Sequence, residues 1–169
     1  MAKYFTLICF TFLLISCGGS KKTTSSKTTT KTNTRVSKSS NRGASRAIVD
    51  YAKTFQGTRY KFGGTTKNGM DCSGLIYVSF QQEGIQLPRV SRDMAKRGKR
   101  ITTSKANAGD LVFFRTNKNS NQINHVGLVV SNSGGTLKFI HSSSSKGVII
   151  SSLEERYWKS AFVEARSIL

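Results

Sequence analysis

The chain has 169 residues, with 27 lysines and arginines against 8 aspartates and glutamates, for a formal net charge of +19. This length accommodates one domain with an extension, and 37% hydrophobic residues are enough for a core, so two full domains and wholesale disorder are both excluded. The charge favours a polyanionic partner such as nucleic acid, a membrane surface or a cell-wall polymer, whereas three cysteines are too few for a disulfide scaffold.

The N-terminus has the pattern of an export signal. Lys3 precedes an apolar run at 4–15, which is too short to span a bilayer but suits a signal-peptide core. The run ends in Leu-Ile-Ser-Cys, which resembles the lipobox of bacterial lipoproteins. We predict a signal peptide at 1–16, lipidation of Cys17, and an exported protein anchored to a membrane, the outer one on its periplasmic side. An ordinary secretory signal with a chance cysteine is the alternative.

The next segment differs sharply in composition from the rest. Residues 18–46 contain 14 serines and threonines and 8 basic residues, with no acidic residue. Such a stretch buries too little apolar surface to offset chain entropy, so 17–46 is predicted to be a disordered tether carrying the lipidated cysteine. A positive tether is attracted to anionic surfaces, although it also fits a plain solvated linker. The globular domain is predicted at 47–169.

The first half of the domain has helical patterns. Ser45 is placed to cap the first predicted helix, Gly57 to end it, and Asp71 to cap the second. A glycine-containing loop at 60–64 separates these two helices. The three predicted helices are at 46–55, 72–82 and 91–97.

The second half has strand patterns with glycine-containing turns, interrupted by a helical turn at 153–158. Helices followed by an antiparallel run of strands indicate an α+β domain. The predicted strands are at 111–115, 125–130, 136–141, 147–151 and 161–167.

Cys72 is the candidate for chemistry. It is the only cysteine left in the exported domain, and it follows Asp71 at a predicted helix start, where a thiol pKa falls if an imidazole lies nearby. Backbone N–H groups at that helix end can form an oxyanion hole. The only two histidines, His125 and His141, open one predicted strand and close the next, so antiparallel pairing brings them together. A buried unreactive cysteine, a structural His141 and a zinc site formed by the three residues remain as alternatives.

Several motifs resemble the NlpC/P60 family of cell-wall peptidases, in the family's order and over essentially all of residues 47–169. The shared signatures are YKFGG at 60–64, DCSGLI at 71–76, GDLVFF at 109–114 and HVGLVV at 125–130. The Spr/MepS type of lipoprotein within this family is further matched by HSS at 141–143, GVIISS at 147–152, YWK at 157–159 and EAR at 164–166.

This resemblance implies a reduced papain-like domain in which a cysteine-bearing helix packs on an antiparallel sheet. It implies Cys72 as nucleophile, His125 as general base and His141 as the residue that orients it. Tyr60, Asp71 and Ser73 carry over as substrate-binding groups around the thiol. No cofactor and no metal are implied.

The implied substrates are the stem peptides of peptidoglycan, cut by a lipid-anchored monomer. The Spr/MepS type favours the D,D cross-link between diaminopimelate and D-Ala. The broader family favours the bond between γ-D-Glu and diaminopimelate, and a non-catalytic wall-binding lipoprotein is a third possibility. An acyltransferase would need a tunnel for an acyl chain, and no sequence feature indicates one. No nucleic-acid partner is expected, because residues 18–46 contain no aromatic residue.

One position departs from the family pattern. Met94 stands where the family often has glutamine, so we expect the loop at 91–97 to be shaped differently around the substrate. Asp110 is interpreted as a turn residue. A basic cluster between residues 89 and 100 suits a solvated face, and it also suits the carboxylates of stem peptides.

Overall fold

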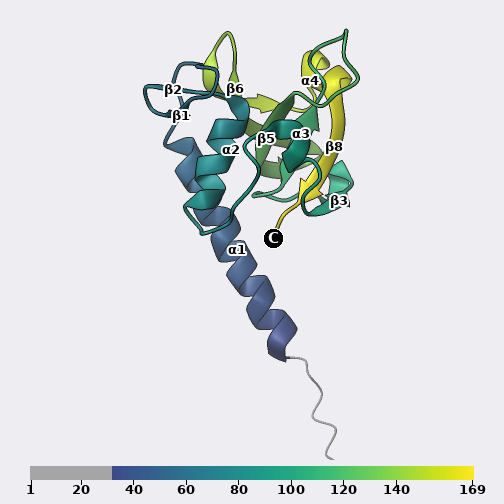
Figure 1. Ribbon diagram of the computed structural model, residues 1–169. Helices are drawn as coiled ribbons and strands as arrows, with labels where there is room; N and C mark the ends of the chain where they lie inside the picture. Colours follow the sequence, from purple (N-terminus) through teal and green to yellow (C-terminus); the bar gives the residue numbers. More distant parts are fainter. Residues whose placement is uncertain (1–31) are drawn as a thin grey trace, which may run out of the picture. The chain divides into compact units, whose positions relative to one another are not determined.

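The computed structural model describes residues 32–169, with side chains from residue 39 onward (Figure 1). The predicted signal peptide at 1–16, the lipidation site Cys17 and the first half of the predicted tether lie outside the described residues. Among the helices described, none is both long and apolar enough to cross a membrane.

Four α-helices and one short 3₁₀ helix are present in the described chain. Helix α2 begins at Cys72 as predicted, and the short polar helix α3 begins at Ser91 as predicted. The α-helices are α1 (Thr32–Lys53), α2 (Cys72–Gln81), α3 (Ser91–Met94) and α4 (Arg156–Ala161), and the 3₁₀ helix η1 is Thr103–Lys105.

Helix α1 corrects the predicted tether and its boundary. It begins at Thr32 rather than near Ser45, so residues 32–46 are helical and the boundary proposed at residue 47 falls inside a continuous helix. Ile48, Val49 and Ala52 are buried and anchor its C-terminal turns. Extending a helix that is already anchored avoids the cost of nucleation, and this segment contains no proline. A prediction based on composition alone leaves out that cooperative gain.

The strands form one six-stranded antiparallel sheet and a small hairpin. The hairpin, made of β1 (Thr65–Thr66) and β2 (Gly69–Met70), was not predicted. The large sheet has the order β3-β8-β4-β5-β6-β7. Its strands are β3 (Lys99–Ile101), β4 (Leu111–Phe114), β5 (His125–Ser133), β6 (Thr136–Ser143), β7 (Gly147–Ser152) and β8 (Phe162–Ser167). All of them were predicted except β3, which has three residues and lies at one edge.

Both faces of the sheet are covered. Leu111 and Phe113 of β4 face a core that contains the apolar sides of α1 and α2, whereas Val112 and Phe114 face a second core that includes Trp158 of α4. This alternation is the two-residue period of a strand buried on both sides. The architecture is therefore α+β, as predicted, with a cysteine-bearing helix packed on an antiparallel sheet.

Candidate active site

Cys72 is the first residue of α2, and the cap of that helix fixes its position. Asp71 has an extended backbone, and its side chain accepts a hydrogen bond from the N–H of Gly74 at 2.6 Å. The inward face of α2 is buried in the core, as the spacing of its apolar residues predicts. The thiol is therefore held at a rigid helix N-terminus, partly exposed to a cleft.

Asp71 also forms the centre of a polar cluster around the thiol. Its two carboxylate oxygens accept hydrogen bonds from Arg89 Nη1 and Nη2, both at 2.8 Å, and Gly63 N–H donates to it at 2.7 Å. Arg89 Nη1 donates also to Ser73 Oγ at 2.7 Å. Burial works against the charged carboxylate, yet the hydrogen bonds and charge of Arg89 hold the pKa of Asp71 below its ordinary value.

The two histidines meet as predicted from their places on neighbouring strands. His125 Nε2 lies 3.0 Å from His141 Nδ1, and the rings are nearly perpendicular. Strands β5 and β6 pair antiparallel and bring the two residues together. His141 is fully buried, and its Nε2 lies 3.0 Å from Ser151 Oγ on β7. The result is a continuous polar chain from His125 through His141 to Ser151.

Trp158 packs on both histidine rings from α4. Its ring stacks on His125 with centroids 5.2 Å apart and meets His141 edge-on at 4.5 Å. Phe139, two residues before His141 on β6 and on the same face of that strand, also contacts His141, with ring centroids 5.1 Å apart. These aromatic contacts restrict ring rotation and shield His141 from solvent, while His125 stays partly exposed.

The enclosure keeps both imidazoles neutral. Burial lowers the pKa of His125 to about 4, and burial together with the neighbouring His125 lowers the pKa of His141 to about 3. Neutral imidazole is the form that can act as a base, so His125 is available for proton transfer at neutral pH.

Cys72 departs from the low thiol pKa expected from its place at a helix start. Burial raises the pKa of Cys72, and the charge of Asp71 raises it further, while the backbone N–H groups of Val126 and Ser73 favour the thiolate. Desolvation therefore outweighs the helix terminus, and the resting group is a neutral thiol.

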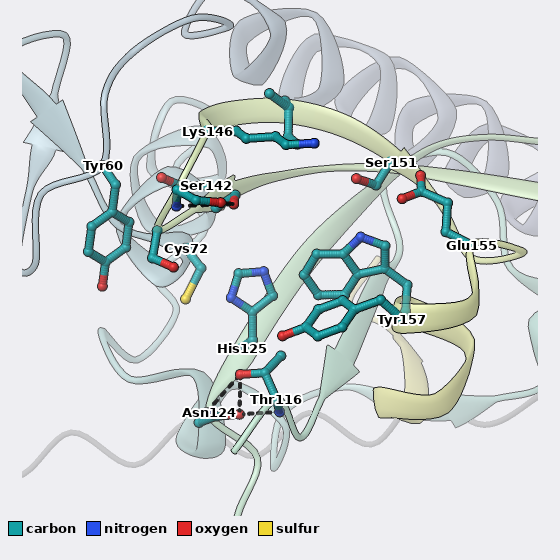
Figure 2. A pocket seen from close by; sticks show the side chains of 15 residues that line it. Tyr60, Cys72, Thr116, Asn124, His125, Ser142, Lys146, Ser151, Glu155 and Tyr157 are labelled. Carbon is teal, nitrogen blue, oxygen red and sulfur yellow. Dashed lines mark hydrogen bonds between the residues drawn. The ribbon is translucent and has the colours of Figure 1, made fainter. Parts of the chain in front are cut away.

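Cys72 lies where two hollows of the surface adjoin. The hollows measure about 450 and 510 Å³, and both are lined by Tyr60, Cys72 and Asn124. His125 and Lys146 line the first, while Asp71, Ser73, Arg89 and Arg92 contribute to the second. Figure 2 shows the first hollow, with Tyr60 and Cys72 on one side of His125 and Tyr157 on the other. The thiol is therefore accessible from both hollows.

Tyr60 reaches this junction from the loop before the small hairpin. Burial raises its pKa, and the negative charges of Cys72 in its thiolate form and of Asp71 raise it further. Its hydroxyl is therefore protonated and can donate a hydrogen bond to an anionic oxygen. Ser73 and Asp71 also line the cleft, but their side chains are already bonded to Arg89.

Some residues of the site were overlooked or misread from sequence. Arg89 belongs to the basic cluster expected either on a solvated face or against substrate carboxylates, whereas in the structure its partner is the buried carboxylate of Asp71. Ser151 and Trp158 were noted only as parts of motifs. Met94 is fully buried in the core, so its side chain does not shape the cleft. Asp110 accepts a hydrogen bond from Asn107 N–H at 2.7 Å, which confirms it as a turn residue.

The zinc alternative gains no support. Within the described part of the chain, no group of three or more histidine, cysteine, aspartate or glutamate side chains is arranged to hold a metal ion. His125 and His141 direct one ring nitrogen each at the other, and His141 Nε2 faces Ser151 Oγ. Of the three residues, only His125 Nδ1 and Cys72 Sγ are left to share a further ligand.

Sequence comparison identifies the domain. A model of the NlpC/P60 family matches residues 57–167. The chain belongs to this family. Over 123 residues it is 41% identical to the murein DD-endopeptidase MepS/murein LD-carboxypeptidase of Escherichia coli K12, a match covering 72% of this chain and 62% of that protein. It is 39% identical to a probable endopeptidase NlpC homolog of Haemophilus influenzae, covering 80% of this chain and 69% of that one.

Structural comparison agrees with the family assignment. The solved NlpC/p60 domain of the peptidoglycan hydrolase SagA superposes with a TM-score of 0.60 at 28% identity, covering 73% of this chain and 97% of that domain. The resemblance to NlpC/P60 proteins and the papain-like α+β fold expected from it are thus confirmed. The chain spans under two thirds of the length of its Escherichia coli relative.

Proposed function

We propose that this protein is a peptidoglycan hydrolase, a cysteine endopeptidase that cleaves stem peptides. The observation that carries the proposal is the junction of Cys72 and His125 in one hollow, with His125 bonded to a second, buried histidine. A nucleophile, a base and an orienting group in this order suit acyl transfer. The names of the relatives from Escherichia coli and Haemophilus influenzae support the same class of substrate.

The mechanism begins with a neutral thiol. Cys72 Sγ attacks the scissile carbonyl carbon while its proton passes to His125 Nδ1, because Nε2 of that ring is bonded to His141. The oxyanion receives hydrogen bonds from the backbone N–H at the start of α2 and from Tyr60 Oη. His125 then gives the proton to the departing amine. Water attacks the resulting thioester, with His125 again as base, and releases the acid product.

The bond cut is proposed to be the D,D cross-link between diaminopimelate and D-Ala. The DD-endopeptidase activity in the name of the Escherichia coli relative supports this choice over the bond between γ-D-Glu and diaminopimelate. Lys146 and Arg92 line the two hollows and offer positive charge to the carboxylates of such peptides.

The test is digestion of purified peptidoglycan by the full-length chain and by Cys72→Ala, with the released muropeptides identified by mass spectrometry. We expect cross-linked dimers to become monomers with the natural chain only. Release of products cut between γ-D-Glu and diaminopimelate would replace the proposed bond with its alternative. Tight binding to peptidoglycan without release of muropeptides would support the alternative of a non-catalytic wall-binding protein. Equal release of muropeptides by both proteins would show that Cys72 is not part of the mechanism.

Export and anchoring at Cys17 are a separate proposal, based on the apolar run and the Leu-Ile-Ser-Cys sequence. The mature protein is expected to begin at a lipidated Cys17 and to fractionate with the outer membrane. The intact mass of the protein purified from membranes tests this directly. A Cys17→Ala variant that remains membrane-bound and keeps the same modified mass would contradict it.

A further inference from the structure

Ser151 closes the polar chain that begins at His125. It lies on β7, next to β6, with only 5% of its surface exposed, and its Oγ is 3.0 Å from His141 Nε2. His141 is fully buried, and both of its ring nitrogens are therefore used: Nδ1 by His125 and Nε2 by Ser151. The position of the single ring proton of His141 follows from what these two partners require.

His125, at one end of the chain, needs one ring nitrogen free to act as the base. His125 uses Nε2 for its contact with His141, so only Nδ1 can receive a proton from Cys72. A neutral imidazole with Nδ1 free carries its proton on Nε2 and donates it to His141 Nδ1. His141 must then carry its own proton on Nε2, where its partner is Ser151.

The reverse arrangement of protons would block the base. If Ser151 donated to His141 Nε2, His141 would donate from Nδ1 to His125 Nε2, and the proton of His125 would sit on Nδ1. That nitrogen could not take a proton from Cys72. The two arrangements use the same heavy-atom distances and differ only in whether the Ser151 hydroxyl accepts or donates.

Two features favour Ser151 as the acceptor. Positive charge develops on the histidine pair when His125 takes the thiol proton, and a hydroxyl oxygen pointing at that charge stabilises it. Glu155 lines the same hollow as Ser151 (Figure 2), and although its Oε1 accepts a hydrogen bond from Ser152 N–H at 2.7 Å, its negative charge favours a Ser151 hydroxyl proton turned into the hollow and away from His141. Trp158 contacts both imidazole rings and restricts their rotation. The two states of the pair therefore differ in which ring nitrogens carry protons, not in ring orientation.

We propose that Ser151 is a positioning residue that accepts a hydrogen bond from His141 Nε2 and so keeps His125 Nδ1 free to act as the base. The consequence for turnover rests on the proposed function. The arrangement of protons in the resting protein does not, and it is measurable without a substrate.

The direct test is the tautomeric state of the two histidines. The chain contains only two, so long-range ¹⁵N–¹H correlation spectra of the full-length chain with ¹⁵N-labelled histidine show four ring nitrogens. We expect both histidines of the natural chain to be protonated on Nε2 at neutral pH. Protonation of either ring on Nδ1 instead would overturn the proposal without any variant.

Variants test the role of the hydroxyl. Ser151→Ala should give a mixture of His141 tautomers and lower kcat about ten-fold with little change in KM, the effect of one lost hydrogen bond. Ser151→Thr keeps the oxygen and should restore both properties. If Ser151→Ala does not fold, Ser151→Cys is used in its place, because its sulfur is only a weak hydrogen-bond acceptor and its side chain is similar in size to serine.

The matched control is Ser79→Ala, which removes another buried serine hydroxyl, one bonded to Leu75 O at 2.7 Å within α2. It should leave the tautomers and kcat unchanged. Two results for Ser151→Ala would overturn the proposal. One is a loss of activity while the histidine tautomers stay as in the natural chain, and the other is a variant whose kcat and tautomers are both unchanged. If peptidoglycan is not cleaved at all, the proposed function fails while the tautomer spectra still decide the role of Ser151.

Discussion

Cys72 is governed by two opposing effects on its thiol. The helix start and the N–H groups of Ser73 and Val126 favour the thiolate, whereas burial and the negative Asp71 disfavour it more strongly. The nearby His125 is neutral for the same reason of burial. The site therefore starts from a thiol and a neutral base rather than from an ion pair.

The rate at which Cys72 is alkylated should report this resting state. With iodoacetamide, we expect the rate to rise about ten-fold per pH unit from pH 7 to 9, because only the thiolate reacts. Mass spectrometry of peptides from the full-length chain separates this residue from Cys9 and Cys17. A plateau from pH 5 to 8 would instead indicate a thiolate–imidazolium pair.

Arg89 should be important for stability because it donates two hydrogen bonds to the buried carboxylate of Asp71. Arg89→Met removes the two guanidinium donors from the Asp71 carboxylate and is expected to lower the unfolding free energy by about 3 kcal/mol. Arg89→Lys keeps the charge but loses the bidentate contact, so its cost should be smaller.

A matched control is Arg100→Met, which removes an arginine that is 67% exposed from its ion pair with Glu164. Its cost should stay below about 1 kcal/mol. Urea denaturation of the three variants measures these differences, and equal losses in Arg89→Met and Arg100→Met would contradict the interpretation.

At the scale of elements, two helices contain a glycine in opposite surroundings. In α2, a Cβ on Gly74 would lie 2.1 Å from Gly64 O, so the close approach of the 60–64 loop requires glycine. In α1, a Cβ on Gly43 would meet nothing within 4 Å. The same substitution therefore has different consequences in the two helices.

We expect Gly74→Ala to destabilise the protein by about 2–4 kcal/mol and to displace the loop that carries Tyr60. Gly43→Ala should instead stabilise α1 by about 0.5–1 kcal/mol, because alanine restricts the unfolded chain and favours the helix. Thermal unfolding and far-UV circular dichroism measure both. A neutral Gly74→Ala would contradict the close contact, and a Gly43→Ala variant without increased stability would contradict the extended helix.

The predicted and observed elements differ where local pattern is weak. Helix α2 and five strands carry clear apolar periodicity and were predicted. The small hairpin and β3 have two or three residues per strand, too few to show a period, and they form only because a neighbour pairs with them. The N-terminal half of α1 has the composition of a linker and is helical by extension from its anchored end.

At the scale of the whole molecule, the buried histidines couple folding to pH. Both have an ordinary pKa of 6.5 that falls on folding, to about 4 for His125 and about 3 for His141. Below pH 6.5 the unfolded chain therefore binds protons that the folded chain does not, so acid favours unfolding.

The unfolding free energy should be insensitive to these groups above pH 6.5. It should fall as the pH drops from 6.5 toward 4, by up to about 1.4 kcal/mol per pH unit for each histidine. Denaturation at several pH values measures the slope. The double variant His125→Gln/His141→Gln should lower the slope over this range whatever its own stability, and an unchanged slope would contradict the burial of neutral imidazoles.

The sequence by itself determined the elements with strong periodicity, the α+β class, the family and the candidate triad, because each depends on residues close together or on motifs read in order. The tertiary structure alone decided what surrounds those residues. It pairs Asp71 with Arg89, encloses the histidines with Trp158, adds Ser151 behind His141 and raises the pKa of Cys72. These properties arise from burial and from contacts between residues far apart in the chain, and local sequence carries no direct signal of either.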